Sequence, residues 1–226
     1  MNIKALVGSS LLLGCLMSAS AFAQTAQTCR VTRQTGNGVV FYVPSGGDGK
    51  YNLLGWGNGT GGAANTYQGA LTAAAQRCVL VAAATTANSI SGVAVQDAVN
   101  QARSRFSNIL NSDLKICTSG HQQGGGGSFN AANVIGSAVS CVIAVNPDTV
   151  FTGSIARPVA PNVDVTCIFA TGDTLSGAQP NNSNNCRRNS TIYTEVLVPG
   201  TGFTIVSGTG GQVGAAMRAQ IDRLLR

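Results

Sequence analysis

The stretch Gly120-His121-Gln122-Gln123-Gly124 opens a run of glycines near the middle of this 226-residue chain. It follows the largely apolar segment 114–118, which predicts a short buried strand, and precedes the segment 128–134, which predicts a helix. Glycine has no β-carbon, so it fits where a backbone turns sharply and where a strand and a helix pass close together. The pattern therefore predicts a strand, a tight turn and a helix.

The same arrangement is the setting of a nucleophile elbow, in which the pattern G-x-S-x-G lifts a serine above a sheet. Gln122 stands at the serine position of that pattern. A neutral carboxamide has no hydroxyl or thiol to activate, so it cannot start acyl transfer. The frame of a serine hydrolase is present, but its nucleophile is replaced.

Gly120-His121-x-x-Gly124, with the three glycines and Ser128 that follow, resembles the elbow of secreted bacterial polyester hydrolases of the cutinase and PET-hydrolase type. Those proteins belong to the α/β-hydrolase superfamily, and the resemblance extends from about Val39 to the C-terminus. It implies an α/β-hydrolase fold and an ester-bearing or apolar ligand, either a small molecule or a polymer. The motif does not specify the substrate.

The rest of the chain alternates between apolar strands and helical patterns. We predict strands at 39–43, 53–56, 78–84, 139–145, 163–170 and 191–198, and helices at 67–75, 95–110 and 213–225. This alternation predicts an α/β protein with a mostly parallel central sheet and helices on both faces. The Asn-rich segment 179–189 is predicted as a loop that leaves little length for a helix between the last two strands.

The other members of a catalytic triad can be sought after the late strands. Asp173 fits the acid position, with Asp148 as the second choice, and a turn-forming aspartate beside Gly172 is an equal alternative. The histidine base should follow the last strand, and Gly202 stands at that position. The only histidine of the chain, His121, lies inside the elbow, where a structural role is expected.

The segment 57–62 is rich in glycine and follows a strand. It contains G-x-G-x-x-G, but no acidic residue follows at the spacing that a dinucleotide site needs. In the α/β-hydrolase fold this loop supplies one oxyanion-hole N–H. The resemblance assigns that donor to Asn58, with Gly59 as an alternative, and assigns the second donor to Gln123. A plain glycine-rich turn remains an alternative.

Three aromatic residues are candidates for the walls of a ligand cleft. They are Trp56, Tyr67 and Phe203.

The N-terminus predicts export. Residues 1–23 have a lysine near the start, an apolar run and a small-residue cleavage site, which is the pattern of a secretory signal peptide. The apolar run is shorter than the roughly 20 residues of a membrane span, so no membrane span is predicted. Removing 23 of 226 residues leaves a single domain of 203 residues, 24–226, in the periplasm or outside the cell.

Loss of the signal would also remove Cys15 and leave six cysteines, an even number in an exported chain. Up to three disulfides are therefore expected. The one pairing that we predict joins Cys167 to Cys186, and the other pairings stay open.

The net charge of +6 reflects few acidic residues rather than a basic cluster. No basic stripe with interleaved aromatics is visible, so nucleic-acid binding is not predicted. One histidine and eight acidic residues show no metal-ligand spacing, and no cofactor is predicted.

Two hypotheses about function remain. The first is a catalytically silent α/β-hydrolase that acts as a binding or structural protein of the cell envelope or exterior. The second is an active carboxylester hydrolase with a non-standard nucleophile. Losses at both 122 and 202 favour the first, because nucleophile and base exchange the same proton.

Overall fold

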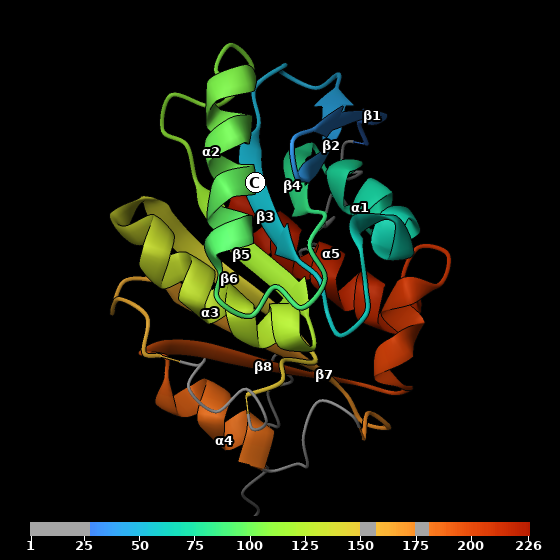
Figure 1. Cartoon of the computed structure of the whole chain (residues 1–226), viewed down its shortest axis with the longest axis vertical. Helices are drawn as coiled ribbons and strands as arrows, with labels where there is room; N and C mark the ends of the chain where they lie inside the picture. The colour runs from blue at the N-terminus through green and yellow to red at the C-terminus, as the bar shows by residue number, and fades with distance from the viewer. Residues whose placement is uncertain (1–27, 150–156, 175–180) are drawn as a thin grey trace, which may run out of the picture.

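The structure is a computed structural model that describes residues 28–149, 157–174 and 181–226. The predicted signal peptide lies outside the described residues. An eight-stranded sheet with strand order β1-β2-β4-β3-β5-β6-β7-β8 runs through the molecule (Figure 1). β1 and β2 pair antiparallel, as do β2 and β4, and every other neighbouring pair is parallel.

The strands are β1 (Arg30–Gly36), β2 (Val39–Ser45), β3 (Asn52–Gly57), β4 (Val79–Ala84), β5 (Ile116–His121), β6 (Val139–Val145), β7 (Asp164–Ala170) and β8 (Ile192–Val198). The α-helices are α1 (Gln68–Ala75), α2 (Val93–Arg105), α3 (Gln123–Ile135), α4 (Asn181–Arg188) and α5 (Gly211–Leu225). Short 3-10 turns are η1 (Ala64–Tyr67), η2 (Gly136–Ala138) and η3 (Gly202–Val206).

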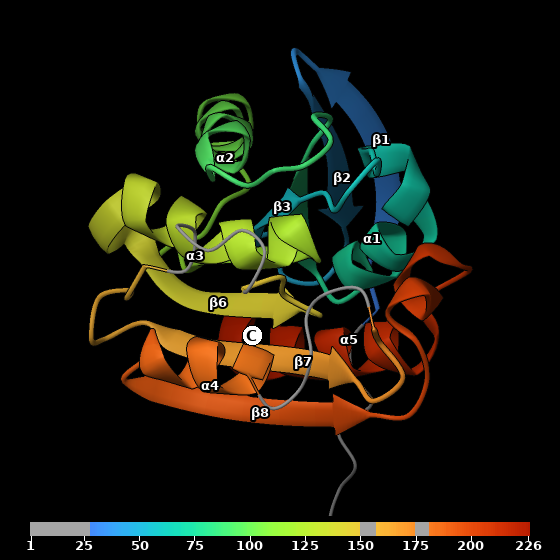
Figure 2. The ribbon, with the colours of Figure 1, turned by 60° about the horizontal axis from the view of Figure 1, so that its bottom comes forward.

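Helices cover both faces of the sheet (Figure 2). Leu54 of β3 packs in one buried cluster with residues of α1 and α5, whereas its neighbour Leu53 packs in a second cluster with residues of α2 and α3. Successive side chains of a strand point to opposite faces, so the buried parallel strands must be apolar on both sides. This explains the continuous apolar runs of the central strands and confirms the predicted α/β-hydrolase architecture.

Two predictions about individual segments are wrong, and one strand was not predicted. The elbow strand was expected at 114–118, but β5 extends to His121 because it stays paired with β6 as far as the His121–Val145 register. The Asn-rich segment, expected as a loop, contains the two-turn helix α4. The edge strand β1 was not predicted, because its sequence RVTRQTG is polar and largely exposed.

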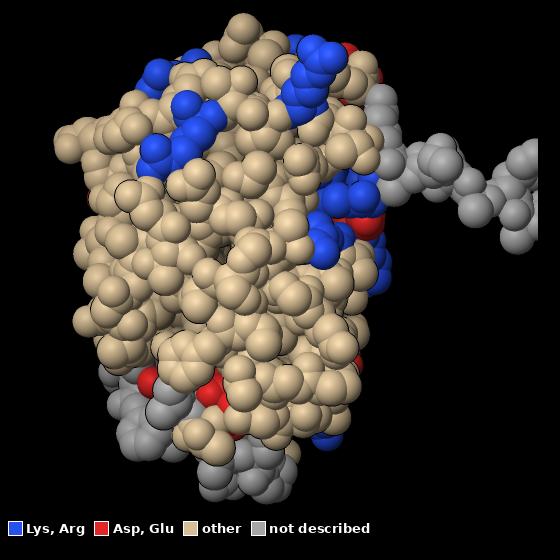
Figure 3. Space-filling model, turned by 90° about the vertical axis from the view of Figure 1, so that its right-hand side faces the viewer, with Lys and Arg blue, Asp and Glu red and all other residues tan. Residues whose placement is uncertain are grey.

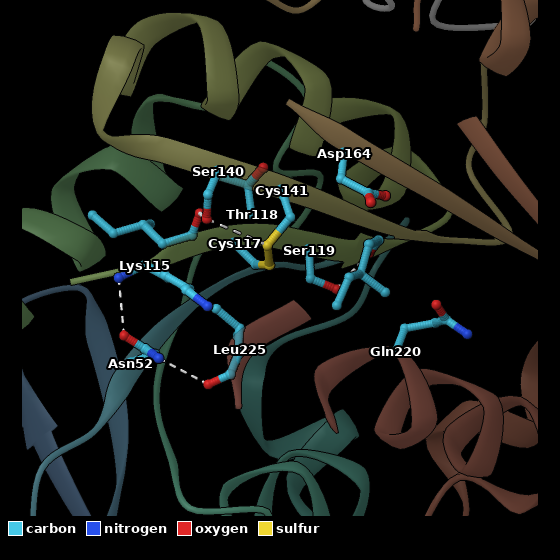
Figure 4. The surroundings of a disulfide bond; sticks show 12 residues. Asn52, Lys115, Cys117, Thr118, Ser119, Ser140, Cys141, Asp164, Gln220 and Leu225 are labelled. Atoms are coloured by element: carbon cyan, nitrogen blue, oxygen red, sulfur yellow. Dashed lines mark hydrogen bonds between the residues drawn. A yellow bond between two sulfur atoms is a disulfide. The ribbon is translucent and has the colours of Figure 1, made fainter. Parts of the chain in front are cut away.

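Three disulfides join the described cysteines. Cys167 of β7 bonds to Cys186 of α4, which confirms the predicted pairing, and the other two are Cys29–Cys78 and Cys117–Cys141. Cys117 and Cys141 are register partners on β5 and β6, so this bond crosses between neighbouring strands beneath the elbow (Figure 4). It fixes the elbow strand to its neighbour.

No helix in the part of the chain that the structure describes is both long enough and apolar enough to cross a bilayer.

Candidate active site

The junction between β5 and α3 has the backbone of a nucleophile elbow. Gln122 has φ 50° and ψ −117°, a conformation that residues with a side chain rarely adopt. Its N–H donates to the carbonyl of Val145 at 3.1 Å. Its carbonyl accepts from the N–H of Gly126 and from the N–H of Asp148, both at 2.9 Å. These bonds on both sides of the residue hold a conformation that would otherwise cost about 1–3 kcal/mol.

The elbow is tight because backbones meet without side chains between them. A β-carbon at Gly120 would overlap the carbonyl of Gly124, and a β-carbon at Gly124 would overlap the carbonyl of Gly57. β3, β5 and the first turn of α3 therefore touch through glycine. This is the steric reason for the glycines that the sequence pattern suggested.

Asp173 and Gly202 lie together after the last two strands. A β-carbon at Gly202 would be 2.7 Å from Asp173 Oδ2 and 3.1 Å from Asn146 Nδ2. The carboxylate thus fills the space that a side chain at position 202 would enter. The structure brings the predicted acid position and the predicted base position into direct contact. Asp148, the second choice for the acid, is buried and bonds to the elbow through its backbone N–H.

His121 is buried, with 1 % of its surface exposed, and its Nδ1 lies 3.1 Å from the hydroxyl of Tyr67. That hydroxyl accepts from the N–H of Gly59 at 3.2 Å, so its own proton is directed to Nδ1 of the ring. Burial lowers the pKa of His121 to about 4, although the nearby Asp173 carboxylate and the Gly202 backbone act in the opposite direction. A neutral, hydrogen-bonded ring in the core has the structural role expected for it.

Segment 57–62 was expected to supply an oxyanion-hole N–H from Asn58 or Gly59, but both N–H groups are engaged within the chain. The N–H of Asn58 donates to Ser89 Oγ at 3.0 Å, and Asn58 is fully buried. Its side-chain amide donates to the carbonyls of Ala84 and Thr86. Asn58 therefore holds the loop in place, and its N–H is not free to bind an oxyanion. The alternative donor, Gly59, is occupied by Tyr67. Gln123 lies in the first turn of α3, where N–H groups have no intrahelical partner.

Two of the three predicted cleft walls lie in the core. Trp56 is 0 % exposed and donates from its indole N–H to Asn58 Oδ1, and Tyr67 is 3 % exposed. Their rings contact each other edge to face. Neither presents a face to solvent. The polar group of each side chain makes a hydrogen bond to segment 57–62. Phe203 is 52 % exposed, so it alone among the three can contact a ligand at the surface.

Sequence reasoning missed Asn146 and Ser89. Asn146 directly follows β6 and has φ 40°. Its Oδ1 accepts from the N–H of Ala170 at 2.6 Å, which ties the end of β6 to the end of β7. The only sequence signal for Asn146 is its place between the predicted strand 139–145 and Pro147. No local pattern marks Ser89.

Some buried polar atoms near the C-terminal ends of β5 and β6 have no hydrogen-bond partner among the described residues. Gln123 Oε1 and Asn146 Nδ2 are buried and make no hydrogen bond within the part of the chain that the structure describes. An unsatisfied buried polar atom costs about 1–3 kcal/mol, and a functional role is one of the reasons for which native proteins keep such atoms.

The two serines that flank the elbow in the sequence, Ser119 and Ser128, are engaged in hydrogen bonds. Ser119 lies on β5 within the sheet and donates to the carbonyl of Ile143 at 2.6 Å (Figure 4). Ser128 donates to the carbonyl of Gly125 at 2.6 Å. Both are fully buried. Across the described ranges, no group of three or more His, Cys, Asp or Glu residues could hold a metal ion.

No known sequence family and no curated protein matches the chain. Solved structures do. A thermostable esterase from Pseudomonas putida superimposes with a TM-score of 0.66 at 12 % identity, covering 89 % of this chain and 85 % of that one. An esterase from Pyrobaculum calidifontis has a TM-score of 0.62 at 14 % identity, with coverages of 86 % and 85 %.

A thioesterase domain from the curacin biosynthetic pathway has a TM-score of 0.54 at 12 % identity, covering 85 % of this chain and 98 % of that domain. At such identities the likeness concerns the fold and not the chemistry. Together with the sheet order and the elbow, it shows that this chain has the α/β-hydrolase fold.

Proposed function

We propose that this chain is an exported α/β-hydrolase-fold protein that has lost ester hydrolysis and acts by binding, in the cell envelope or outside the cell. The observation that carries this proposal is Gln122 in the strained elbow, with φ 50° and ψ −117°. The backbone has the form that presents a nucleophile, while the side chain has no atom to activate.

The position predicted for the base supports the same proposal. Gly202 has no side chain, and the Asp173 carboxylate packs against it. His121 is poorly suited to act as the base, because its ring is buried with Nδ1 bonded to the Tyr67 hydroxyl, and burial lowers its pKa to about 4, which makes it a weak base. Proton transfer between nucleophile and base therefore lacks both partners.

The predicted signal peptide and the disulfides support export, whereas the surface composition and Phe203 support an uncharged ligand. The chain has a predicted signal peptide and three disulfides, which persist in oxidising compartments. On the face in Figure 3, most residues are uncharged and the Lys and Arg residues form separate groups. The exposed Phe203 follows the last strand and offers an apolar contact for an ester-bearing small molecule or polymer.

A fluorophosphonate probe tests the proposal, because it labels any activated serine hydroxyl. We expect the intact mass of the purified chain to stay unchanged after long incubation, while an active serine esterase in the same tube is labelled completely. A stoichiometric adduct would reject the silent-hydrolase proposal in favour of the second hypothesis, and the modified peptide would identify the nucleophile.

A further inference from the structure

The chain contains two Asn-Gly pairs, Asn37-Gly38 and Asn58-Gly59, which the structure places in opposite surroundings. In such a pair the backbone nitrogen of the glycine can attack the side-chain amide of the asparagine, because glycine has no β-carbon to hinder the approach. The attack requires an asparagine side chain that is able to turn and a glycine N–H that is not engaged. The two pairs differ in both respects.

Asn58-Gly59 is locked at both reacting groups. Asn58 is fully buried, its Nδ2 donates to two backbone carbonyls, and its Oδ1 accepts from the indole N–H of Trp56. The N–H of Gly59, which would be the attacking group, donates to the Tyr67 hydroxyl at 3.2 Å. The fold therefore protects this pair from the reaction.

Asn37-Gly38 forms the two-residue turn between β1 and β2, at one edge of the sheet (Figure 2). Both residues are exposed, and a β-carbon at Gly38 would meet nothing within 4 Å. Among the described residues, none makes a hydrogen bond with the Asn37 side chain or with the N–H of Gly38. Both reacting groups of this pair are therefore available.

The backbone carbonyls of the same turn are held. The carbonyl of Asn37 accepts from Gln101 Nε2 at 2.8 Å, and the carbonyl of Gly38 accepts from the N–H of Thr85 at 2.9 Å. Gly38 has φ 69°, which glycine adopts without strain. The turn thus stays exposed in the folded protein, with its carbonyls bonded to neighbouring segments and its reacting groups directed at no partner.

We propose that Asn37 is a site of spontaneous deamidation in the folded protein, and that Asn58 is not. The Gly38 nitrogen forms a bond to Asn37 Cγ, the bond between Cγ and Nδ2 breaks, and the amide group leaves as ammonia with the proton of the Gly38 N–H. A succinimide ring closes between the two residues. Water then adds to one of its two carbonyls. Opening at Cγ gives aspartate at position 37, and opening at the backbone carbonyl gives isoaspartate.

Either product changes the surface at this edge. Asn37 and Asp97 line the same open pocket of about 380 Å³, so a new carboxylate at 37 comes close to an existing one. Isoaspartate also adds the β-carbon of residue 37 to the backbone of the turn, which then no longer matches the pairing of Gly36 with Val39 or the contact with Gln101. We expect the modified protein to be less positively charged and its β1–β2 hairpin to be looser.

Peptide mapping of the folded mature protein, aged in mildly alkaline buffer, tests the proposal. Trypsin cuts after Arg33, Lys50 and Arg77, so the two pairs fall on separate peptides, 34–50 and 51–77, and neither peptide contains a cysteine. We expect Asn37 to deamidate at least about tenfold faster than Asn58, because Asn58 reacts only after the fold opens around it. In protein that is reduced and unfolded in urea, the two rates should become similar.

Asn37→Gln is the matched control, because it keeps the carboxamide but lengthens the side chain, and 34–50 contains no other asparagine. Its peptide should stay unmodified, and its hairpin should exchange amide hydrogens equally before and after ageing, whereas β1 of the aged wild-type protein should exchange faster. An isoaspartyl methyltransferase should label the aged wild-type peptide 34–50 and not that of the variant.

Two results would overturn the proposal. One is an Asn37 that stays intact in the folded protein for as long as the unfolded chain needs to deamidate at this position. The other is deamidation of Asn58 in the folded protein at the same rate as Asn37. Neither result depends on whether the chain hydrolyses esters.

Discussion

The backbone at Gln122 keeps a conformation that costs about 1–3 kcal/mol, although the side chain that it carries is a carboxamide. Its persistence has a local explanation. The peptide groups of Gln122 bond to Val145, Gly126 and Asp148, and the glycines on either side pack against backbone where no β-carbon fits. The conformation is therefore fixed by its surroundings and not by the side chain at 122, which explains how this side chain could change without loss of the elbow.

His121 should make the fold sensitive to acid. Its pKa is about 4 in the folded chain and about 6.5 in an unfolded one, so the unfolded state binds a proton first. The contribution of the neutral ring to stability is fully present above pH 6.5 and is lost as the pH falls towards 4. We expect this group to lower the free energy of unfolding by roughly 3 kcal/mol across that interval.

Urea unfolding at pH 7 and at pH 4.5 measures this effect. The carboxylates titrate in the same range, so the comparison is with His121→Asn, which keeps an acceptor near Nδ1 for the Tyr67 hydroxyl but does not titrate. The variant should lose less stability than the wild-type protein between the two pH values. Identical losses would show that the pKa of His121 is not depressed.

At the scale of elements, the sequence predicted seven of the eight strands and four of the five α-helices that lie in the described residues. Buried parallel strands and amphipathic helices leave strong apolar patterns. β1 escaped because an edge strand buries little and reads as polar. α4 escaped because its sequence NNSNNCRR contains no apolar stripe. It is held instead by Cys186 and by Asn182, which bonds to Pro147 and Thr149.

The candidate site was predicted unevenly for a related reason. The sequence placed Asp173 and Gly202 after late strands, and the structure has them side by side, because strand ends can be located in a sequence. Asn58 and Tyr67 were given other roles, because which N–H of a loop is engaged depends on residues distant in sequence. Ser89 occupies the Asn58 N–H from 31 positions away.

The disulfide between β5 and β6 is expected to hold the elbow strand in register. Cys117 and Cys141 are 24 residues apart and almost fully buried. Replacing both by alanine should lower the free energy of unfolding by about 3 kcal/mol, because the unfolded chain gains the freedom of the opened loop. Urea unfolding measures the loss.

The double replacement of Cys167 and Cys186 is the matched control, since its sequence separation of 19 predicts a loss of similar size. A Cys117→Ala/Cys141→Ala variant as stable as the wild-type protein would contradict the role assigned to the bond between the strands.

At the scale of the whole molecule, the three disulfides lie in different parts of the sheet: one near its N-terminal edge, one at its centre and one near its C-terminal edge. Cys29–Cys78 ties the segment before β1 to the start of β4, Cys117–Cys141 crosses the centre, and Cys167–Cys186 fixes α4 to β7. A chain of this kind should be exported with no free thiol once its signal is removed.

Thiol titration of the mature protein in denaturant without reductant should detect no free thiol, and titration after reduction should detect six. Two or more free thiols per chain before reduction would contradict the three-disulfide arrangement.

The central claim is that chemistry was lost at two side chains while the scaffold stayed intact. The most direct measurement is the turnover of a short activated ester by Gln122→Ser/Gly202→His. The φ of Gly202 lies outside the left-handed region, and the atoms that a new β-carbon would meet belong to the ends of the Asp173 and Asn146 side chains. A histidine therefore fits if the Asp173 carboxylate shifts to a position beside the imidazole. The variant Gln122→Ser/Gly202→Ala is the matched control, since it forces the same shift without adding a base.

Triad members act as a unit, so neither single variant should hydrolyse the ester, whereas the double variant should show clear turnover. Adding Asp173→Asn should then remove most of that turnover, because the histidine would lose the carboxylate that orients it. The contradicting result is a folded Gln122→Ser/Gly202→His protein that hydrolyses the ester no faster than Gln122→Ser/Gly202→Ala.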